Sequence, residues 1–286
     1  MKVGSSESIV PVAAVQLDVA EGDAHANVDH CLDTLHQAAA EGARVVVFPE
    51  CGLTGYLFDD RSAAFAAALD ANAPELTKIT DAACALGVLA VVGYLEATDA
   101  NTIYNTALIT GRGVEPTRYR KAHLPCLGAD RFATLGDVGP VVVPTPFGRV
   151  GVGLGYDMRF PEWLRTLALL GADVVAFPAN WPTQAVDLAD VVSRVRAMEN
   201  RVFVVVANRG DAAHGIDFAG RSRIVSPGGA VLTSAERDER VVCGVVDLAQ
   251  ARDKTLVVSI GEYEAHLFND RRPDLYGAIT EPRRHA

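Results

Sequence analysis

Three segments of the sequence combine residue types that can act together on a carbonyl group. The first holds Glu50, directly after a short apolar run, and the second holds Lys121 two residues before His123. The third places Gly155 at a turn between an apolar run and a helix predicted to begin near Pro161. A carboxylate can act as a general base, an ammonium can stabilise an oxyanion, and a strand–turn–helix elbow can expose a nucleophile.

Each segment also has a purely structural interpretation when it is taken alone. Glu50 fits a turn residue or a helix cap, and Lys121 with His123 fits a solvated basic turn. Glycine at position 155 fits a backbone with positive φ or a close approach of two chains, because it has no Cβ. No Ser, Cys or Thr stands at the apex of the elbow, so we expect a small void there.

Strands and helices alternate around these segments. This alternation predicts an α/β fold, and the hairpin-like pair 88–95 and 103–110 predicts a mixed sheet. Periodicity leaves open whether the strands form one sheet or two. The expected strands cover residues 10–17, 44–48, 88–95, 103–110, 141–143, 150–154, 174–177 and 202–207, with strand-like pieces at 216–225 and 241–246. The expected helices cover 24–41, 61–86 with an interruption near Pro74, 162–170 and 184–200.

Composition limits the class of protein. The 286 residues are 49% apolar and contain no linker or repeat, which predicts a single domain over residues 1–286. A net charge of −10 argues against a nucleic-acid partner, which would need a basic face. No run approaches the roughly 20 apolar residues of a membrane span. Five scattered cysteines and the lack of a signal-peptide pattern predict a reduced, cytoplasmic setting.

The wording and order of the motifs resemble the nitrilase superfamily of carbon–nitrogen hydrolases, in its amidase-like branch. The resemblance rests on Phe48–Glu50, Tyr119–Leu124 and Gly155–Glu162, and it spans about Val10 to Tyr276. Further matching segments follow in the family's order at residues 177–182, 196–200, 207–209, 220–227 and 270–276. The resemblance implies a four-layer α-β-β-α sandwich, hydrolysis of a C–N bond, and no metal or organic cofactor.

The same resemblance implies roles for individual residues. Glu50 would be the general base, Lys121 would stabilise the tetrahedral intermediate, and the backbone N–H of Tyr156 would be the second oxyanion donor. Position 155 is where the family has its nucleophilic cysteine, and this sequence has glycine there. The family often has a further pocket glutamate, and the best match here is Asp130, six residues before a glycine.

Other residues are expected to contact the substrate. Tyr56, Asn180 and Trp181 follow strand ends and should line the pocket. Arg159 is a candidate substrate ligand, although Asp157 and Arg159 could instead form a local ion pair. His123 is expected to be structural. The substrate would be a small aliphatic amide, an ω-amide of a dicarboxylic acid or an N-carbamoyl amine. By resemblance the chain should form a homodimer or larger homo-oligomer through residues 160–170.

Gly155 admits three interpretations. The first is an engineered, inactive variant of a working amidase that has lost its nucleophile, favoured because Glu50, Lys121 and Asp130 are all retained. The second is a natural pseudoenzyme that binds a small molecule or acts as a scaffold. In the third, Cys51 or Cys126 substitutes as the nucleophile, although free cysteines are more often small packing residues.

Overall fold

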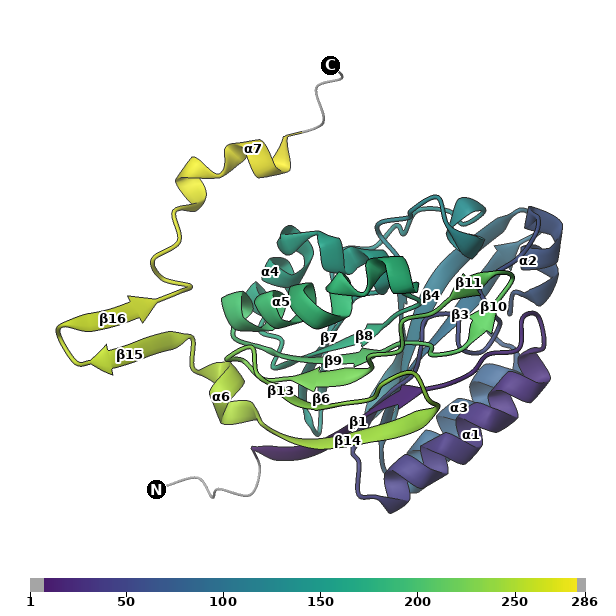
Figure 1. Ribbon diagram of the computed structural model, residues 1–286, viewed down its shortest axis with the longest axis horizontal. Helices are drawn as coiled ribbons and strands as arrows, with labels where there is room; N and C mark the ends of the chain where they lie inside the picture. Colours follow the sequence, from purple (N-terminus) through teal and green to yellow (C-terminus); the bar gives the residue numbers. More distant parts are fainter. Residues whose placement is uncertain (1–7, 282–286) are drawn as a thin grey trace.

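The computed structural model describes residues 8–281 and contains two six-stranded sheets with helices on their outer faces (Figure 1). The first half of the chain contains β1 (Ile9–Gln16), α1 (Ala24–Ala40), β2 (Val45–Val47), α2 (Arg61–Ala67), α3 (Pro74–Leu86), β3 (Leu89–Asp99), β4 (Thr102–Gly111), β5 (Val114–Arg120) and η1 (Gly128–Arg131). The second half contains β6 (Val142–Thr145), β7 (Gly148–Val152), η2 (Gly155–Arg159), α4 (Pro161–Leu169), β8 (Val174–Pro178), η3 (Thr183–Ala185), η4 (Leu188–Val192), α5 (Ser193–Asn200), β9 (Phe203–Ala207), β10 (Ala212–Ala213), β11 (Ile216–Asp217), β12 (Arg223–Val225), β13 (Val231–Ser234) and β14 (Arg240–Asp247).

The first sheet has the strand order β14-β1-β2-β3-β4-β5. Strands β1, β2 and β3 are parallel, and β14, β4 and β5 complete the sheet by antiparallel pairing. Helices α1 and α3 cover its outer face (Figure 1). The α1 helix begins where the Asp23 side chain accepts a hydrogen bond from the Ala26 N–H, and α3 begins with Pro74 and ends at Gly87. These are ordinary helix start and stop residues.

The second sheet has the order β13-β12-β9-β8-β7-β6, with β7, β8 and β9 parallel. Helices α4 and α5 cover its outer face, where Leu164 and Leu167 of α4 join the core. The expected helix over residues 184–200 is instead a short turn, a π-helix and α5. Sequence periodicity cannot anticipate this division, because a π turn differs from an α turn by one residue per hydrogen-bonded ring.

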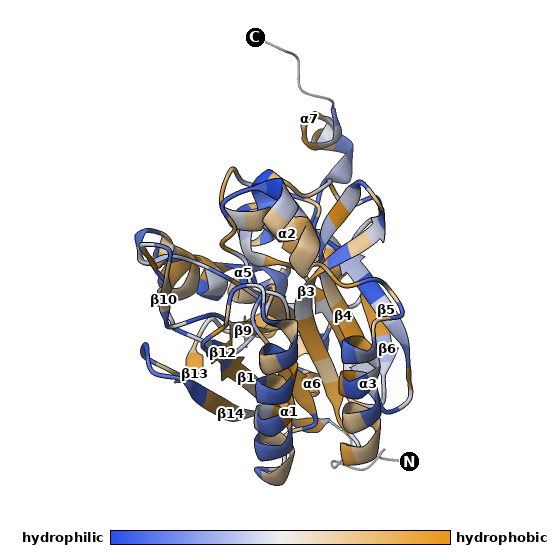
Figure 2. Cartoon of the chain, turned by 90° about the vertical axis from the view of Figure 1, so that its right-hand side faces the viewer, coloured by the Kyte–Doolittle hydropathy of each residue, from blue (hydrophilic) through white to orange (hydrophobic). Residues whose placement is uncertain are grey.

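The inner faces of the two sheets pack against each other. Along β1, Val12 and Ala14 point into the core between the sheets, while Ala13 and Val15 face α1 and α3. This alternation gives each strand two apolar faces, as expected for a sheet covered on both sides. Apolar strands β3 and β4 lie behind helices whose outer surfaces are polar (Figure 2). The predicted four-layer α-β-β-α sandwich is therefore confirmed, and the question of one sheet or two is answered.

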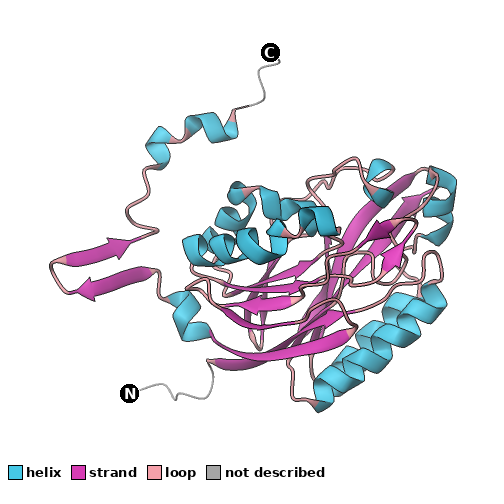
Figure 3. Ribbon diagram, viewed as in Figure 1, coloured by secondary structure: helices cyan, strands magenta, loops and turns pink. Residues whose placement is uncertain are grey.

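The last described residues form an arm that leaves the body (Figures 1 and 3). After α6 (Leu248–Arg252), the chain forms the hairpin β15 (Thr255–Ser259) and β16 (Tyr263–His266), then η5 (Pro273–Leu275) and α7 (Gly277–Thr280). The sequence pattern did not predict this hairpin. Within residues 8–281, no helix is both long and apolar enough to span a bilayer.

Candidate active site

The three segments expected to act together meet at one edge of the sandwich. Glu50 follows β2, Lys121 follows β5, and Gly155 follows β7, so each lies just beyond the carboxyl end of a strand. The Nζ atom of Lys121 lies 2.5 Å from Oε1 of Glu50. A Cβ built on Gly155 would overlap Oε2 of the same carboxylate. The fold thus brings together residues separated by more than a hundred positions in the chain.

Lys121 lies between two buried carboxylates. Its Nζ is 2.5 Å from Oε1 of Glu50 and 2.5 Å from Oδ2 of Asp130. Asn105 of β4 links the two carboxylates, because its Nδ2 donates to Oε1 of Glu50 and to Oδ1 of Asp130, at 2.8 Å each. The sequence analysis did not identify Asn105. The available signal was an asparagine inside a strand, where this residue type is disfavoured.

Burial and charge determine the protonation of this cluster. Burial raises the pKa of Glu50 to about 7; Lys121 opposes this rise and Asp130 adds to it. Burial alone would lower the pKa of Lys121, but Asp130 and Glu50 outweigh it and hold that pKa above its usual value. Near neutral pH, Lys121 is therefore an ammonium beside a carboxylate that titrates in the same range. A general base works best when its pKa lies near the working pH.

Gly155 has a φ of +37°, a backbone conformation that residues with a side chain rarely adopt. The expected void at the elbow is absent, because the Glu50 carboxylate fills the space that a Cβ would need. The carbonyl of Gly155 accepts a hydrogen bond of 3.0 Å from Nε1 of Trp181. Tyr156 is the second residue of η2, so its N–H belongs to the first turn, where amides have no acceptor within the helix.

Asp157 ties the elbow to the loop that carries Lys121. Its Oδ2 accepts from the Tyr119 hydroxyl at 2.7 Å and from the Leu154 N–H at 2.8 Å. Its Oδ1 lies 2.7 Å from Nδ1 of His123. The alternative of an ion pair between Asp157 and Arg159 is wrong, because the Asp157 carboxylate is already bound on both oxygens by these other groups. His123 stacks on Phe160 at 3.8 Å, which is consistent with a structural role.

A cavity of about 160 Å³ opens beside Gly155. Asp130 lies behind Lys121, outside the lining of this cavity. Apolar side chains of Pro125, Leu127, Pro182, Ala185 and Leu188 complete the wall. The cavity is lined by eight of the candidate residues: Glu50, Tyr56, Lys121, Gly155, Tyr156, Arg159, Asn180 and Trp181.

Asn180 is buried against the general-base candidate. Its Nδ2 donates a hydrogen bond of 2.7 Å to the backbone carbonyl of Glu50. That bond fixes the orientation of the amide, because Oδ1 could only repel the carbonyl. Oδ1 is then left buried without a partner among the described residues. A donor on a bound ligand could satisfy it.

Tyr56 is positioned from both ends. Its hydroxyl donates to Oδ2 of Asp130 at 2.9 Å, and its ring fills the space where Gly128 lacks a Cβ. Its backbone N–H is bound at 2.5 Å by Glu21, whose other oxygen is 2.6 Å from Nη1 of the fully buried Arg209. Arg209 follows β9, so the second sheet helps to fix a pocket residue carried by the first.

Neither of the two cysteines considered as substitute nucleophiles lines the cavity beside Gly155. Cys51 is buried, and burial with the nearby Glu50 and Asp130 carboxylates raises the pKa of its thiol well above its usual value. Its thiolate, the reactive form, is therefore strongly disfavoured. Cys126 is exposed and lines a neighbouring cavity with Asp59 and His214, not the cavity beside Gly155.

Comparison with known proteins agrees with this architecture. The carbon–nitrogen hydrolase family model matches residues 11–254, and the chain belongs to this family. It is 36% identical to a nitrilase from Pyrococcus abyssi, over 94% of this chain and 99% of that protein. It is 28% identical to an omega-amidase from Homo sapiens, over 93% of this chain and 96% of that protein. It is also 28% identical to a 2-oxoglutaramate amidase from Bacillus subtilis, over 93% and 98%.

Solved structures share the fold. A carbon–nitrogen hydrolase from Helicobacter pylori superimposes with a TM-score of 0.82 at 20% identity, covering 96% of this chain and 99% of that one. A cysteine-to-alanine mutant of an amidase from Nesterenkonia, in the nitrilase superfamily, gives a TM-score of 0.78 at 21% identity, covering 98% and 100%. At these identities the likeness speaks for the fold alone.

Proposed function

We propose that this site is an amidase site for small amides that lacks its nucleophile at position 155. The observation that carries the proposal is the buried Glu50–Lys121–Asp130 cluster facing the elbow. A buried ammonium between two carboxylates has a high desolvation cost, and removing one partner leaves an uncompensated charge. A functional role for these charges, acting on a bound substrate, would account for a buried cluster that is costly to the stability of the fold.

The chemistry would proceed through a thiol at position 155. Glu50 would accept the thiol proton through Oε2, which lies against that position. The sulfur would attack the amide carbon, and Lys121 with the Tyr156 N–H would stabilise the oxyanion. Ammonia would leave with a proton returned from Glu50, and water activated by Glu50 would then cleave the thioester. With Gly155 the first step is missing, so the chain should bind amides without cleaving them.

Arg159 supports an acidic amide as the substrate. It lines the cavity, and its guanidinium forms no ion pair within the described part of the chain. An ω-amide of a dicarboxylic acid would place its carbonyl at Lys121 and its free carboxylate at Arg159. The omega-amidase and 2-oxoglutaramate amidase relatives favour the same class. The unpartnered Oδ1 of Asn180 could accept from the amide NH₂.

The test is the Gly155→Cys variant, assayed for ammonia release from glutaramate and from the uncharged butyramide. Removing the nucleophile of a comparable catalytic set costs on the order of 10⁶-fold in rate, so the native chain should be silent and the variant active. Mass spectrometry should detect an acyl adduct on the new thiol. Adding Glu50→Gln should abolish turnover, and adding Arg159→Gln should raise KM for glutaramate but not for butyramide.

A binding protein without catalysis is the second candidate. The Glu50 carboxylate occupies the space of the missing side chain, so the site is closed around glycine rather than left vacant. A Gly155→Cys variant that folds yet gives neither turnover nor adduct would favour this function. Turnover by the native chain that Cys126→Ala abolishes would instead assign the nucleophile to Cys126.

A further inference from the structure

The reaction proposed for this site has two halves, and only the first half needs a nucleophile at position 155. In the second half, water activated by Glu50 cleaves a thioester while Lys121 and the Tyr156 N–H stabilise the oxyanion. All three groups are present in the native chain around the cavity beside Gly155. An activity that uses these groups alone rests on the proposed function, because it gives them the same roles.

The two carboxylate oxygens of Glu50 have different surroundings. Oε1 accepts hydrogen bonds from Nζ of Lys121 at 2.5 Å and from Nδ2 of Asn105 at 2.8 Å. Oε2 accepts none from residues 8–281 and lies against the elbow, where a Cβ of residue 155 would need the same space. One oxygen therefore fixes the carboxylate, and the other is free to take a proton from water in the cavity.

The cavity beside Gly155 can hold water together with a short acyl group. Its volume is about 160 Å³, whereas one water molecule needs on the order of 10–15 Å³. The side chains of Pro125, Leu127 and Leu188 give it an apolar wall for a short hydrocarbon chain. A small acyl compound therefore suits this cavity in size and polarity.

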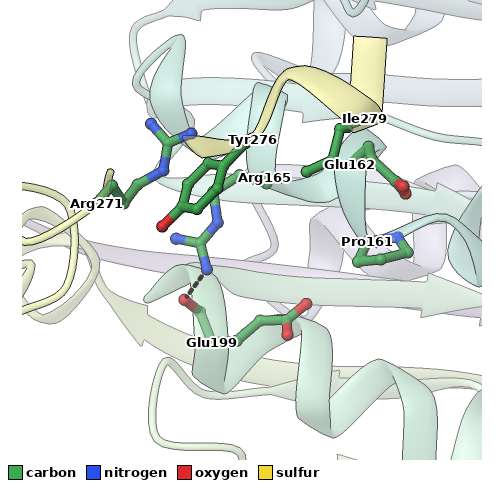
Figure 4. A pocket seen from close by; sticks show the side chains of 7 residues that line it. All are labelled: Pro161, Glu162, Arg165, Glu199, Arg271, Tyr276 and Ile279. Atoms are coloured by element: carbon green, nitrogen blue, oxygen red, sulfur yellow. Dashed lines mark hydrogen bonds between the residues drawn. The ribbon is translucent and has the colours of Figure 1, made fainter. Parts of the chain in front are cut away.

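The larger cavity drawn in Figure 4 is not a site for this chemistry. Its volume is about 270 Å³, but Glu50 is not among the residues that line it. Its wall includes Pro161 and Arg165, which belong to the segment 160–170 through which self-association is predicted. The reaction is therefore placed at the smaller cavity.

The leaving group decides which acyl compounds such a site can cleave. When water attacks an amide, the nitrogen of the intermediate must gain a proton before it can leave. A thiolate leaves without one, because the pKa of a cysteine-type thiol is about 8.5 against about 15.7 for water. A thioester is also the compound that the same groups would cleave in the second half of the amidase reaction.

We propose that the native chain is a thioesterase for small acyl thioesters, with Glu50 as the general base. Water would attack the carbonyl carbon while Oε2 of Glu50 takes one of its protons. Lys121 and the Tyr156 N–H would stabilise the oxyanion. The C–S bond would then break, and the thiolate would take the proton from Glu50, which gives a carboxylic acid and a free thiol. No bond to the protein forms, so residue 155 needs no side chain.

The rate should rise with pH as Glu50 loses its proton. Burial raises the pKa of Glu50 to about 7; Lys121 opposes this rise and Asp130 adds to it. The thiol of Cys51 and the hydroxyl of Tyr56 also face these carboxylates. Burial and the carboxylates raise both of their pKa values well above the usual range, so neither group ionises near neutral pH. The kcat/KM should therefore increase through about pH 7 and level off above it.

The test is butyrate release from S-methyl thiobutyrate by the native chain, followed by NMR, with butyramide as the amide of the same acyl group. We expect turnover of the thioester and none of butyramide, which should instead inhibit competitively because it occupies the same cavity. Glu50→Gln should lower kcat/KM at least a hundredfold, since general bases contribute about 10²–10⁴-fold. Glu115→Gln, at an exposed position of β5, is the matched control and should change it less than twofold.

The pH profile and the inhibition by butyramide need no variant, so they test the proposal even if Glu50→Gln does not fold. The proposal is overturned if the native chain does not hydrolyse the thioester, if kcat/KM stays constant with pH, or if butyramide does not inhibit. It is also overturned if Cys126→Ser abolishes turnover, or if mass spectrometry finds an acyl group on the protein.

The outcome is separable from that of the proposed function. A Gly155→Cys variant that hydrolyses amides, beside a native chain that leaves the thioester intact, would refute the thioesterase and keep the amidase site. A native chain that cleaves the thioester, beside a Gly155→Cys variant that cleaves no amide, would support the thioesterase and refute the amidase site.

Discussion

At the scale of single residues, the candidate site depends on how two carboxylates and one ammonium share a buried space. Motif order predicted Glu50, Lys121 and the special position of Gly155, because each follows a recognisable strand. Asn105 escaped prediction, since a lone asparagine in a strand carries no motif and its two acceptors come from distant segments. The sequence also could not predict that the space beside Gly155 is filled, because this depends on the rotamer of Glu50.

Replacing Glu50 with glutamine tests the protonation of this cluster. The pKa of Glu50 is about 7 in the folded chain against an ordinary 4.5, so between these values the folded state holds a proton that the unfolded state has lost. Stability from this group is therefore full below pH 4.5 and is lost as the pH rises towards 7. Glu50→Gln removes that dependence.

The free energy of unfolding of the native chain, minus that of Glu50→Gln, should fall by on the order of 1–3 kcal/mol as the pH rises through this window. Urea denaturation at several pH values between 4.5 and 7.5 measures it. Glu115→Gln, at an exposed position of β5, is the control and should show a much smaller change. A difference for Glu50→Gln that stays constant with pH would contradict the raised pKa.

At the scale of elements, the elbow and the Lys121 loop behave as one unit because Asp157 binds both. The elbow and the helix starting at Pro161 were predictable from the apolar run, the glycine and the proline that mark them. The link to Tyr119 and His123 was not, because hydrogen bonds between segments 34 and 38 residues apart leave no local pattern. The alternative that paired Asp157 with Arg159 considered only neighbours in sequence.

Asp157→Ala should therefore cost more stability than a surface aspartate. It would leave the buried Leu154 N–H and Tyr119 hydroxyl without their acceptor, and each such loss costs about 1–3 kcal/mol. We expect a total loss of about 2–5 kcal/mol in the free energy of unfolding, measured by urea denaturation. His123→Ala should cost less, and the double variant should be less than additive because both residues share one network. A loss no larger than that of the exposed Asp217→Ala would contradict the link.

At the scale of the whole molecule, the path of the chain through residues 8–281 supports the prediction of a single domain. The chain builds five strands of the first sheet, then the second sheet, and returns through β14 to pair with β1. The core between the sheets contains residues of both, such as Val45 and Val175. Composition predicted one domain, and the return of β14 together with this shared core gives the physical reason why the two sheets should not separate.

Unfolding should accordingly occur as a single cooperative transition. Both tryptophans, Trp163 and Trp181, belong to the half of the chain that builds the second sheet, whereas far-ultraviolet circular dichroism reports on both sheets. The two signals should give the same midpoint in urea, as expected for two-state behaviour. An earlier fluorescence transition would mean that the second sheet unfolds alone and would divide the domain.

Self-association, predicted through residues 160–170, is the last property at this scale. Leu169 and Leu170 at the end of α4 are about half exposed, at 45% and 46%, and Met198 of the adjacent α5 is 50% exposed. Contiguous exposed apolar side chains can mark an interaction surface, and these three lie on or at the end of two helices that pack together. Light scattering coupled to gel filtration should give twice the chain mass of 30.3 kDa.

Leu169→Glu should shift the chain to monomer, because the carboxylate would lose its hydration in the contact. Leu135→Glu, at an exposed apolar residue elsewhere, should leave the dimer intact. A native chain that elutes only as a monomer, or equal dissociation by both variants, would rule out this surface.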